Sequence, residues 1–234
     1  MTFLLPLIQR CFWPPLLSLI CSLALVNIGY ATAPAQAQTY TQVRYENLYR
    51  ALEPGLIISG FDRLLARQRI VSRQRDVSPS QIEVRILSAS GTILVKIAPD
   101  GSVNFPMTKA LLSENPVVES NQAKGSLSLS ATMEIKLGGK KVLAYSDIYE
   151  SAMQAQQALT ALGPAMAGHK VRSIEFEFDR TAGARAELSD SKADELLLAD
   201  KQGLLIVRID AALAQRKAQV TFSNVPIAAR PHID

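Results

Sequence analysis

The stretch Gln81-Ile82-Glu83-Val84-Arg85-Ile86 recurs in similar form as Ser173-Ile174-Glu175-Phe176-Glu177-Phe178. Further matches follow in the same order along the chain. They pair Gly91 with Gly183, Gly101 with Gly203, Thr108 with Asp210, Ala110-Leu111 with Ala212-Leu213 and, after one residue of slippage, Val117 with Val220 and Ser120-Asn121 with Ser223-Asn224. Self-similarity of this kind indicates an internal repeat. We therefore expect the second half of the chain to be a diverged copy of the first.

Alternating apolar and polar residues predict strands in the first copy. The segments 82–87 and 92–97 flank a Ser-Ala-Ser-Gly turn, and the Asp100-Gly101 turn leads into a strand at 103–105. Asp-Gly between alternating apolar residues is a strong hairpin signal, because glycine accepts the positive φ that a tight turn needs. The segment 126–136 alternates most regularly, and its expected hairpin partner, 141–145, follows Gly138-Gly139.

Two helices are predicted, one within residues 40–51 and ended by Pro54-Gly55, the other over 147–162 between an Asp147/Glu150 cap and Gly163-Pro164. Strands are expected again at 171–178, 196–198, 204–209 and 218–222. The fold class is thus mainly β (α+β), with two tandem β-rich sandwich-like repeats joined by a helix and a short N-terminal helix. The predicted divisions are 1–37, a signal peptide; 38–145, the N-terminal helix and first repeat; 146–168, a connecting helix; and 169–234, the second repeat.

The first residues have the layout of a secretory signal. Residues 1–37 hold one charge, Arg10, then an apolar run and the small-residue segment Ala35-Gln36-Ala37, which predicts cleavage after Ala37. A retained membrane anchor is the alternative, since about 20 mostly apolar residues can span a bilayer, but Pro14-Pro15 favours cleavage. Both cysteines, Cys11 and Cys21, lie in this segment. Export without disulfides indicates a bacterial periplasm.

Composition and motifs exclude several classes of function. A net charge of +4 does not indicate nucleic-acid binding. The mature chain has no cysteine, its two histidines, His169 and His232, accompany no Gly-x-Ser-x-Gly motif, and no metal-ligand spacing is present. We therefore expect no catalytic residues, no cofactor and no metal site.

Carboxylates on one predicted strand leave an enzymatic alternative open. Glu175, Glu177 and Asp179 share one face of the strand, and in a cleft between the repeats such carboxylates could support a hydrolase or lyase. A simpler interpretation is the solvated face of a half-buried strand whose apolar side chains Ile174, Phe176 and Phe178 point inward.

Clustered arginines form the candidate binding surface: Arg63, Arg67, Arg69, Arg73 and Arg75. On an extended strand over 67–75, alternate residues lie about 6.6 to 6.8 Å apart, so the guanidinium groups would form a row that engages phosphates or carboxylates. The alternatives are a charged edge strand that resists sheet association and a contact with the acidic strand of the second repeat. The sequence thus indicates an exported envelope protein, a non-catalytic binding or structural module whose partner is an envelope protein or anionic envelope component. It leaves the oligomeric state open.

Three segments carry a resemblance: Pro99-Asp100-Gly101-Ser102-Val103-Asn104-Phe105-Pro106, Glu114-Asn115-Pro116-Val117-Val118 and Ser120-Asn121-Gln122-Ala123-Lys124-Gly125-Ser126-Leu127. Across this middle third the chain resembles a family of uncharacterised exported proteobacterial proteins, which implies a secreted β-rich protein and supplies no catalytic residues. The strand, Asp-Gly and aromatic-Pro pattern is also similar to prealbumin-like sandwiches of the carboxypeptidase-regulatory type. Ala110-Leu111-Leu112 departs from the Gly-Tyr return of that type.

Overall fold

The structure, a computed structural model, describes residues 40–180 and 183–234, which belong to one compact unit, Gln38–Asp234. The predicted signal peptide, with Arg10, Cys11 and Cys21, lies outside the described residues. Strands predominate in the described chain and form four antiparallel sheets, so the expected mainly β class is confirmed.

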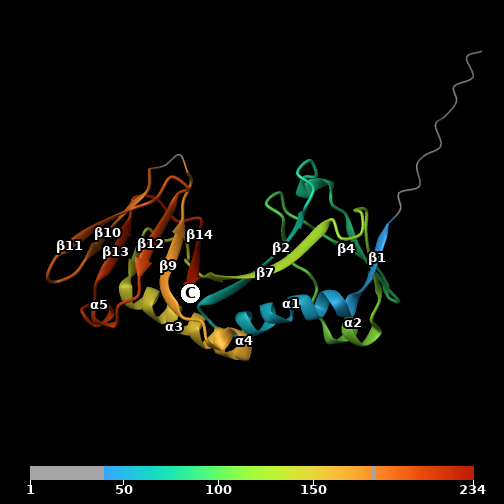
Figure 1. Cartoon of the computed structure of the whole chain (residues 1–234), viewed down its shortest axis with the longest axis horizontal. Coiled ribbons are helices and arrows are strands. Elements are labelled where there is room, and N and C mark those ends of the chain that lie inside the picture. Colours follow the sequence, from blue (N-terminus) through green and yellow to red (C-terminus); the bar gives the residue numbers. More distant parts are fainter. Residues whose placement is uncertain (1–39, 181–182) are drawn as a thin grey trace, which may run out of the picture. The chain divides into compact units, whose positions relative to one another are not determined.

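The first half of the described chain, residues 41–135, contributes two of the sheets (Figure 1). One has the order β1-β6-β3-β4 and the other the order β5-β2-β7. The elements are β1 (Thr41–Arg44), α1 (Tyr45–Ser59), β2 (Leu64–Ser72), a 3-10 turn (Pro79–Gln81), β3 (Val84–Ser88), β4 (Gly91–Val95), β5 (Ser102–Val103), α2 (Lys109–Glu114), β6 (Val117–Ser120) and β7 (Leu127–Ile135).

The second half, residues 142–233, contributes the other two sheets, with the orders β8-β13-β10-β11 and β12-β9-β14. Adding seven to each strand number of the first half reproduces these orders, so every strand has a topological counterpart. The elements are β8 (Val142–Ala144), α3 (Tyr145–Ala161), α4 (Pro164–Ala167), β9 (Val171–Glu177), β10 (Arg185–Ser189), β11 (Asp194–Leu198), β12 (Leu204–Arg208), α5 (Ala211–Gln215), β13 (Gln219–Phe222) and β14 (Ala228–Ile233).

The two long helices, α1 and α3, bury residues at the same distances from their first residue. Both begin with a fully buried tyrosine, Tyr45 in α1 and Tyr145 in α3. Further along, α1 buries Leu52, Gly55 and Ile58, whereas α3 buries alanines at the matching steps, Ala152, Ala155 and Ala158. In α1 the small Gly55 lets the helix approach the sheet, since a Cβ there would lie 3.4 Å from Ala66 and 3.5 Å from Ala131. Residues three and four apart share one face of a helix, so each helix covers its sheet with one stripe.

Each tyrosine hydroxyl connects its helix to the loop that precedes the next short helix. The Tyr45 hydroxyl donates to the Pro106 carbonyl and accepts from the Thr108 amide at 3.3 Å. The Tyr145 hydroxyl donates to the Arg208 carbonyl and accepts from the Asp210 amide at 2.9 Å. Burial raises the pKa of both hydroxyls, which keeps them protonated as donors.

Two hydrophobic cores follow from this arrangement. One, containing Tyr45, Ile86 and Phe105, lies within the first half. The other surrounds Tyr145 and Phe176 of the second half, and it also includes residues of the first half: Ile58, Leu64, Met133 and Ile135. The ends of α1, β2 and β7 therefore complete the core of the second half.

The predicted helix limits are partly wrong. Helix α1 begins at Tyr45 and continues through Pro54 to Ser59, instead of ending at Pro54. Burial of Gly55 and Ile58 beyond the proline outweighs the loss of one backbone hydrogen bond. In α3 the predicted buried stripe is confirmed as far as Leu159, but Asp147 and Glu150 do not cap the helix; both pair with Arg63.

One predicted hairpin is wrong, and a second forms only in part. The Gly138-Gly139 turn connects β7, which pairs with β2, to β8, which pairs with β13, so the expected 126–136 and 141–145 hairpin does not form. At Asp100-Gly101 the turn is present, with Ala98 donating to Ser102, but a single bridge from Ile97 to Val103 joins its arms. Beyond that bridge β4 pairs with β3 and β5 with β2.

The predicted register of the internal match is wrong at both ends. Strand β3, which holds Val84 and Ile86, corresponds in sheet order to β10, whereas the segment matched to it, 173–178, lies in β9, the counterpart of β2. Near the other end, Pro116 and Ala218 accept the amides of Tyr45 and Tyr145, which aligns Val118 rather than Val117 with Val220. Gly101 and Gly203 do occupy equivalent turns, with φ values of 82° and 81°.

We expect Tyr45→Phe and Tyr145→Phe each to lower the free energy of unfolding by about 1 to 3 kcal/mol, because each leaves a backbone carbonyl and amide without their partner. Chemical denaturation monitored by circular dichroism measures the change. Tyr49→Phe is the matched control, because this neighbouring, partly buried tyrosine donates no hydroxyl bond among the described contacts. An equal effect of all three substitutions would contradict the role given to the two buried hydroxyls.

Gly203→Ala should destabilise the protein more than Gly138→Ala. Both glycines have positive φ, but a Cβ at Gly203 would lie 2.6 Å from the Phe178 carbonyl oxygen, whereas one at Gly138 meets nothing within 4 Å. We expect about 1 kcal/mol for Gly138→Ala from backbone conformation alone and a clearly larger loss for Gly203→Ala. Thermal melting of the two variants tests the order, and a reversed order refutes it.

Candidate functional site

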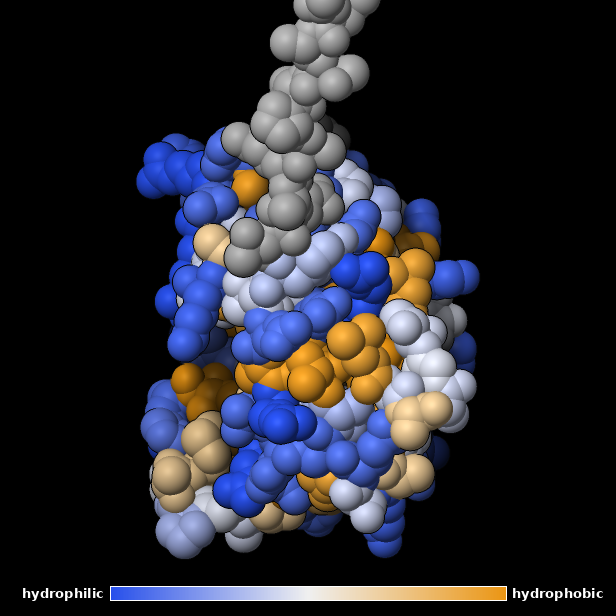
Figure 2. Space-filling view, turned by 90° about the vertical axis from the view of Figure 1, so that its right-hand side faces the viewer, coloured by the Kyte–Doolittle hydropathy of each residue, from blue (hydrophilic) through white to orange (hydrophobic). Residues whose placement is uncertain are grey.

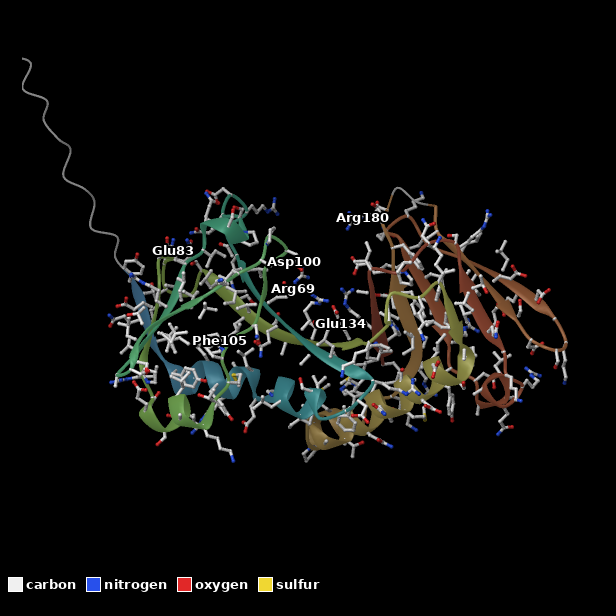
Figure 3. All side chains as sticks on the ribbon, turned by 180° about the vertical axis from the view of Figure 1, so that it is seen from behind. Arg69, Glu83, Asp100, Phe105, Glu134 and Arg180 are labelled. Atoms are coloured by element: carbon white, nitrogen blue, oxygen red, sulfur yellow. The ribbon has the colours of Figure 1, made fainter. Side chains whose placement is uncertain are left out.

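The five arginines of the predicted surface do not form one row. Arg63 precedes β2 and pairs with Asp147, at 3.0 Å, and Glu150 of α3. Arg67 pairs with Glu134 at 2.7 Å. Arg69 donates to the Asp100 carbonyl at 2.6 Å, and Figure 3 shows the two residues together.

The last two arginines, Arg73 and Arg75, follow the end of β2 rather than extending it, so the predicted strand over 67–75 is too long. Both are exposed, and their side chains make no hydrogen bond or ion pair with the described residues. Three of the five predicted arginines are therefore held by the protein itself, and two are free to meet a ligand.

A buried carboxylate organises the charges around Arg67. Glu134 of β7 is 3% exposed and accepts from Arg67 and, at 3.4 Å, from Arg230 of β14 (Figure 3). Arg230 also pairs with Glu177 of β9 at 2.7 Å. The hydrogen bond to Glu134 raises the pKa of Arg67. Because a buried carboxylate needs paired partners, this chain of charges holds strands of both halves together.

The acidic strand of the second half, β9, is half-buried, as the simpler interpretation of its sequence predicts. Its apolar residues Ile174, Phe176 and Phe178 are buried, with at most 2% exposed. Hydrogen bonds from Ile70 to Gly101 and from Phe178 to Gly203 place β9 in register with β2, so that Glu175 and Glu177 occupy the positions of Arg67 and Arg69. The arginines of β2 and the glutamates of β9 are connected through intermediate residues: Arg67 pairs with Glu134, and Arg230 pairs with Glu177.

No carboxylate or metal centre accompanies that strand in the described residues. Neither Glu175 nor Asp179 lines a described cavity. No group of three or more His, Cys, Asp or Glu side chains in residues 40–180 and 183–234 is placed to hold a metal ion. No helix of the same residues has the length and apolar character needed to span a lipid bilayer.

An apolar pocket of about 290 Å³ lies between the two sheets of the first half. Its wall on the β1-β6-β3-β4 sheet includes Val43, Val84 and Val118, and the facing wall of β2 and β7 includes Ile70 and Leu129. The remaining apolar lining comes from Leu48, Phe105 and Leu127. This volume is close to the lower limit of about 300 Å³ for small-molecule sites, and its apolar lining is typical of them.

Polar residues surround the pocket where β6 ends. Thr41 pairs with Ser120 across β1 and β6, and the loop of Gln122, Ala123, Lys124 and Gly125 continues the rim. Between the two sheets the lining is aliphatic and aromatic, so one end of the pocket is polar and the other apolar.

At two positions of the pocket lining the second half carries larger, aromatic side chains. The aligned backbone contacts make Phe178 the counterpart of Ile70 and Phe222 the counterpart of Ser120. The ring of Phe222 lies 5.6 Å from that of Phe178 and 4.7 Å from that of Phe176, and all three are at most 2% exposed. The opposite difference occurs at Phe105, where the first half has the larger side chain and the second half has Val207. The most polar exchange, Ser120 for Phe222, lies at the rim of the pocket.

The outer surface of the β1-β6-β3-β4 sheet carries exposed apolar residues. Leu94 of β4 is 60% exposed and Leu87 of β3 is 37% exposed. Figure 2, which views the molecule from the β1 and β4 side, shows apolar side chains gathered among hydrophilic ones. Nothing in the structure shows what would cover them, so they define no site.

Sequence reasoning missed the pocket because no motif marks it. The available signal was the exchange of Ser120 for Phe222, which becomes visible only when β6 and β13 are aligned in the register of the hydrogen bonds.

Arg67→Gln should destabilise the protein by about 1 to 3 kcal/mol, because it removes the closer partner of a buried carboxylate. The double variant Arg73→Gln/Arg75→Gln should change stability by less than about 0.5 kcal/mol, since neither side chain has a partner in the described chain. Urea unfolding of both proteins measures the difference. Equal stability of Arg67→Gln and the wild type would contradict the structural role of the Glu134 pair.

No protein-family model, curated protein or solved structure matches the chain.

Proposed function

We propose that this protein is a non-catalytic binding module of two tandem sandwich-like units, in which the first unit holds an apolar ligand and the second is its structural partner. With the predicted signal peptide, the module would act in the periplasm. The observation that carries the proposal is the apolar pocket of the first half, where Ile70 and Ser120 stand at the positions that Phe178 and Phe222 occupy in the second half.

The matching element orders support a tandem duplication. They also suggest unit boundaries different from the expected ones: residues 41–135 and 142–233, with a short linker between them. In this proposal α3 is the second unit's own copy of α1, since Tyr45, Leu48 and Tyr49 correspond to Tyr145, Ile148 and Tyr149. It replaces the separate connecting helix expected at 146–168.

The difference between the interiors supports a ligand site in the first unit. A core is normally packed to high density, and an apolar cavity of this size lowers stability. A ligand that occupies the cavity would account for its retention in the first unit. The second unit carries larger side chains, Phe178 and Phe222, at the positions of Ile70 and Ser120. The first unit keeps the smaller residues, as a binding pocket requires.

The arginine surface has a smaller part in this proposal. Arg63, Arg67 and Arg69 contribute structure, which leaves Arg73 and Arg75 as the residues of the predicted surface that remain available to an anionic envelope component. The alternative of a carboxylate-based hydrolase or lyase gains no support, because Glu177 is paired with Arg230 and Glu175 faces no described cavity.

Ser120→Phe tests the pocket. Introducing the residue of the second unit should fill the space and weaken binding of an apolar fluorescent probe such as 1-anilinonaphthalene-8-sulfonate more than about tenfold, because burying each CH₂ equivalent contributes about 0.8 kcal/mol. Fluorescence titration measures the affinity. The same variant should keep or increase the melting temperature, since cavity filling commonly stabilises by about 0.5 to 2 kcal/mol.

Ser113→Phe on α2 is the matched control, because Ser113 is exposed and does not line this pocket. It should leave probe binding unchanged. Unaltered binding in a folded Ser120→Phe protein, or equal loss in both variants, would reject the pocket as the ligand site.

A further inference from the structure

The rim of the pocket carries one charge without a partner. Two charged residues line the pocket, Glu119 and Lys124. The Glu119 carboxylate is engaged by Arg85 at 3.4 Å and by the Gln42 amide at 2.9 Å. The Lys124 side chain is exposed and makes no hydrogen bond or ion pair with the described residues.

Other charges near this rim are also occupied. Arg85 lies over the Tyr40 ring, 4.1 Å from its centroid, and pairs with Glu119. Glu83, labelled in Figure 3, accepts from the Tyr40 hydroxyl at 3.4 Å and does not line the pocket. The ammonium group of Lys124 is therefore the charge that a ligand in the pocket would meet unpaired.

Resting on the proposed function, we infer that the ligand of this pocket is a single-chain amphiphile with an anionic head group, whose chain lies between the sheets and whose head meets Lys124. The interior is apolar, and the polar lining lies at the rim where β6 ends. Such a division matches a molecule that is apolar along its length and polar at one end. The volume of about 290 Å³ fits one short chain rather than a lipid with two.

The rim also supplies neutral hydrogen-bonding groups. The hydroxyl-bearing residues Ser120 and Thr41 line the pocket with Lys124, whereas the side-chain amide of Gln122 already donates to Asn121 and Gln81. A carboxylate or a phosphate monoester accepts such hydrogen bonds and pairs with an ammonium ion, whereas a trimethylammonium head can do neither. The charge of the head group therefore distinguishes this inference from simple apolar binding.

Four probes of equal chain length test it: decanoate, decyl phosphate, decanol and decyltrimethylammonium, titrated calorimetrically below their micelle concentrations. We expect the two anionic probes to bind up to about fivefold more tightly than decanol, the gain typical of one exposed ion pair, and decyltrimethylammonium to bind most weakly. Decanoate and decyl phosphate together show which anion is preferred.

Lys124→Gln should remove the preference for anions and Lys124→Glu should reverse it, both without changing the affinity for decanol. Lys192→Gln, at the exposed turn between β10 and β11, should preserve the wild-type order. Equal affinities for all four probes in the wild type, or an equal loss for all four in Lys124→Gln, would overturn the head-group inference.

The Ser120→Phe variant separates this inference from the proposed function. If it abolishes binding of probes that the wild type does not distinguish, the pocket stands and the anionic head group is wrong. If none of the four probes binds the wild type, or if Ser120→Phe binds them all as the wild type does, the pocket and the inference fail together.

Discussion

Each half depends on a buried tyrosine hydroxyl at the start of its long helix. A phenol without a partner would be costly there, since an unpaired buried polar group loses its hydration without compensation. The hydroxyls of Tyr45 and Tyr145 meet this requirement by bonding the carbonyl and amide of one crossing loop. The helix start and the loop before α2 or α5 are thereby joined in both halves.

On this shared framework the two interiors diverge. Phe178 and Phe222 of the second half pack against each other, whereas the smaller Ile70 and Ser120 line the pocket of the first half. The surfaces diverge as well, because Arg67 and Arg69 of β2 face the same way as Glu175 and Glu177 of β9. Sheet order and the φ values of the Gly101 and Gly203 turns thus match between the halves, while packing and charge differ.

The predictable part of the fold was the part governed by short-range periodicity. The buried stripe of α3 and the alternation of β9 follow from the spacing of apolar residues. The alternation of β7 fails at Glu134, which is buried although its position predicts a solvent-facing side chain. The internal register could not be assigned from Ile82-Glu83-Val84, because every half-buried strand has such a pattern and a six-residue match does not distinguish β3 from β2. The helix match of Tyr45 and Tyr49 with Tyr145 and Tyr149 is more specific and gives the correct alignment. The arginine positions could be read from the sequence, but their partners, above all Glu134, come from distant strands. The pocket could not be predicted, because it arises from small side chains at positions that no motif marks.

The ribbon of β2 and β7 has a consequence for how the molecule loses its structure. Leu64, Met133 and Ile135, at one end of this ribbon, are packed in the core of the second half, and Glu134 between them is paired with Arg230. Melting of the second half would therefore strip apolar cover from the first and leave a buried carboxylate with one partner fewer. The two halves are therefore coupled in stability. A fragment cut between β7 and β8 would not be an independent domain, because it would expose these apolar side chains to solvent and tend to aggregate.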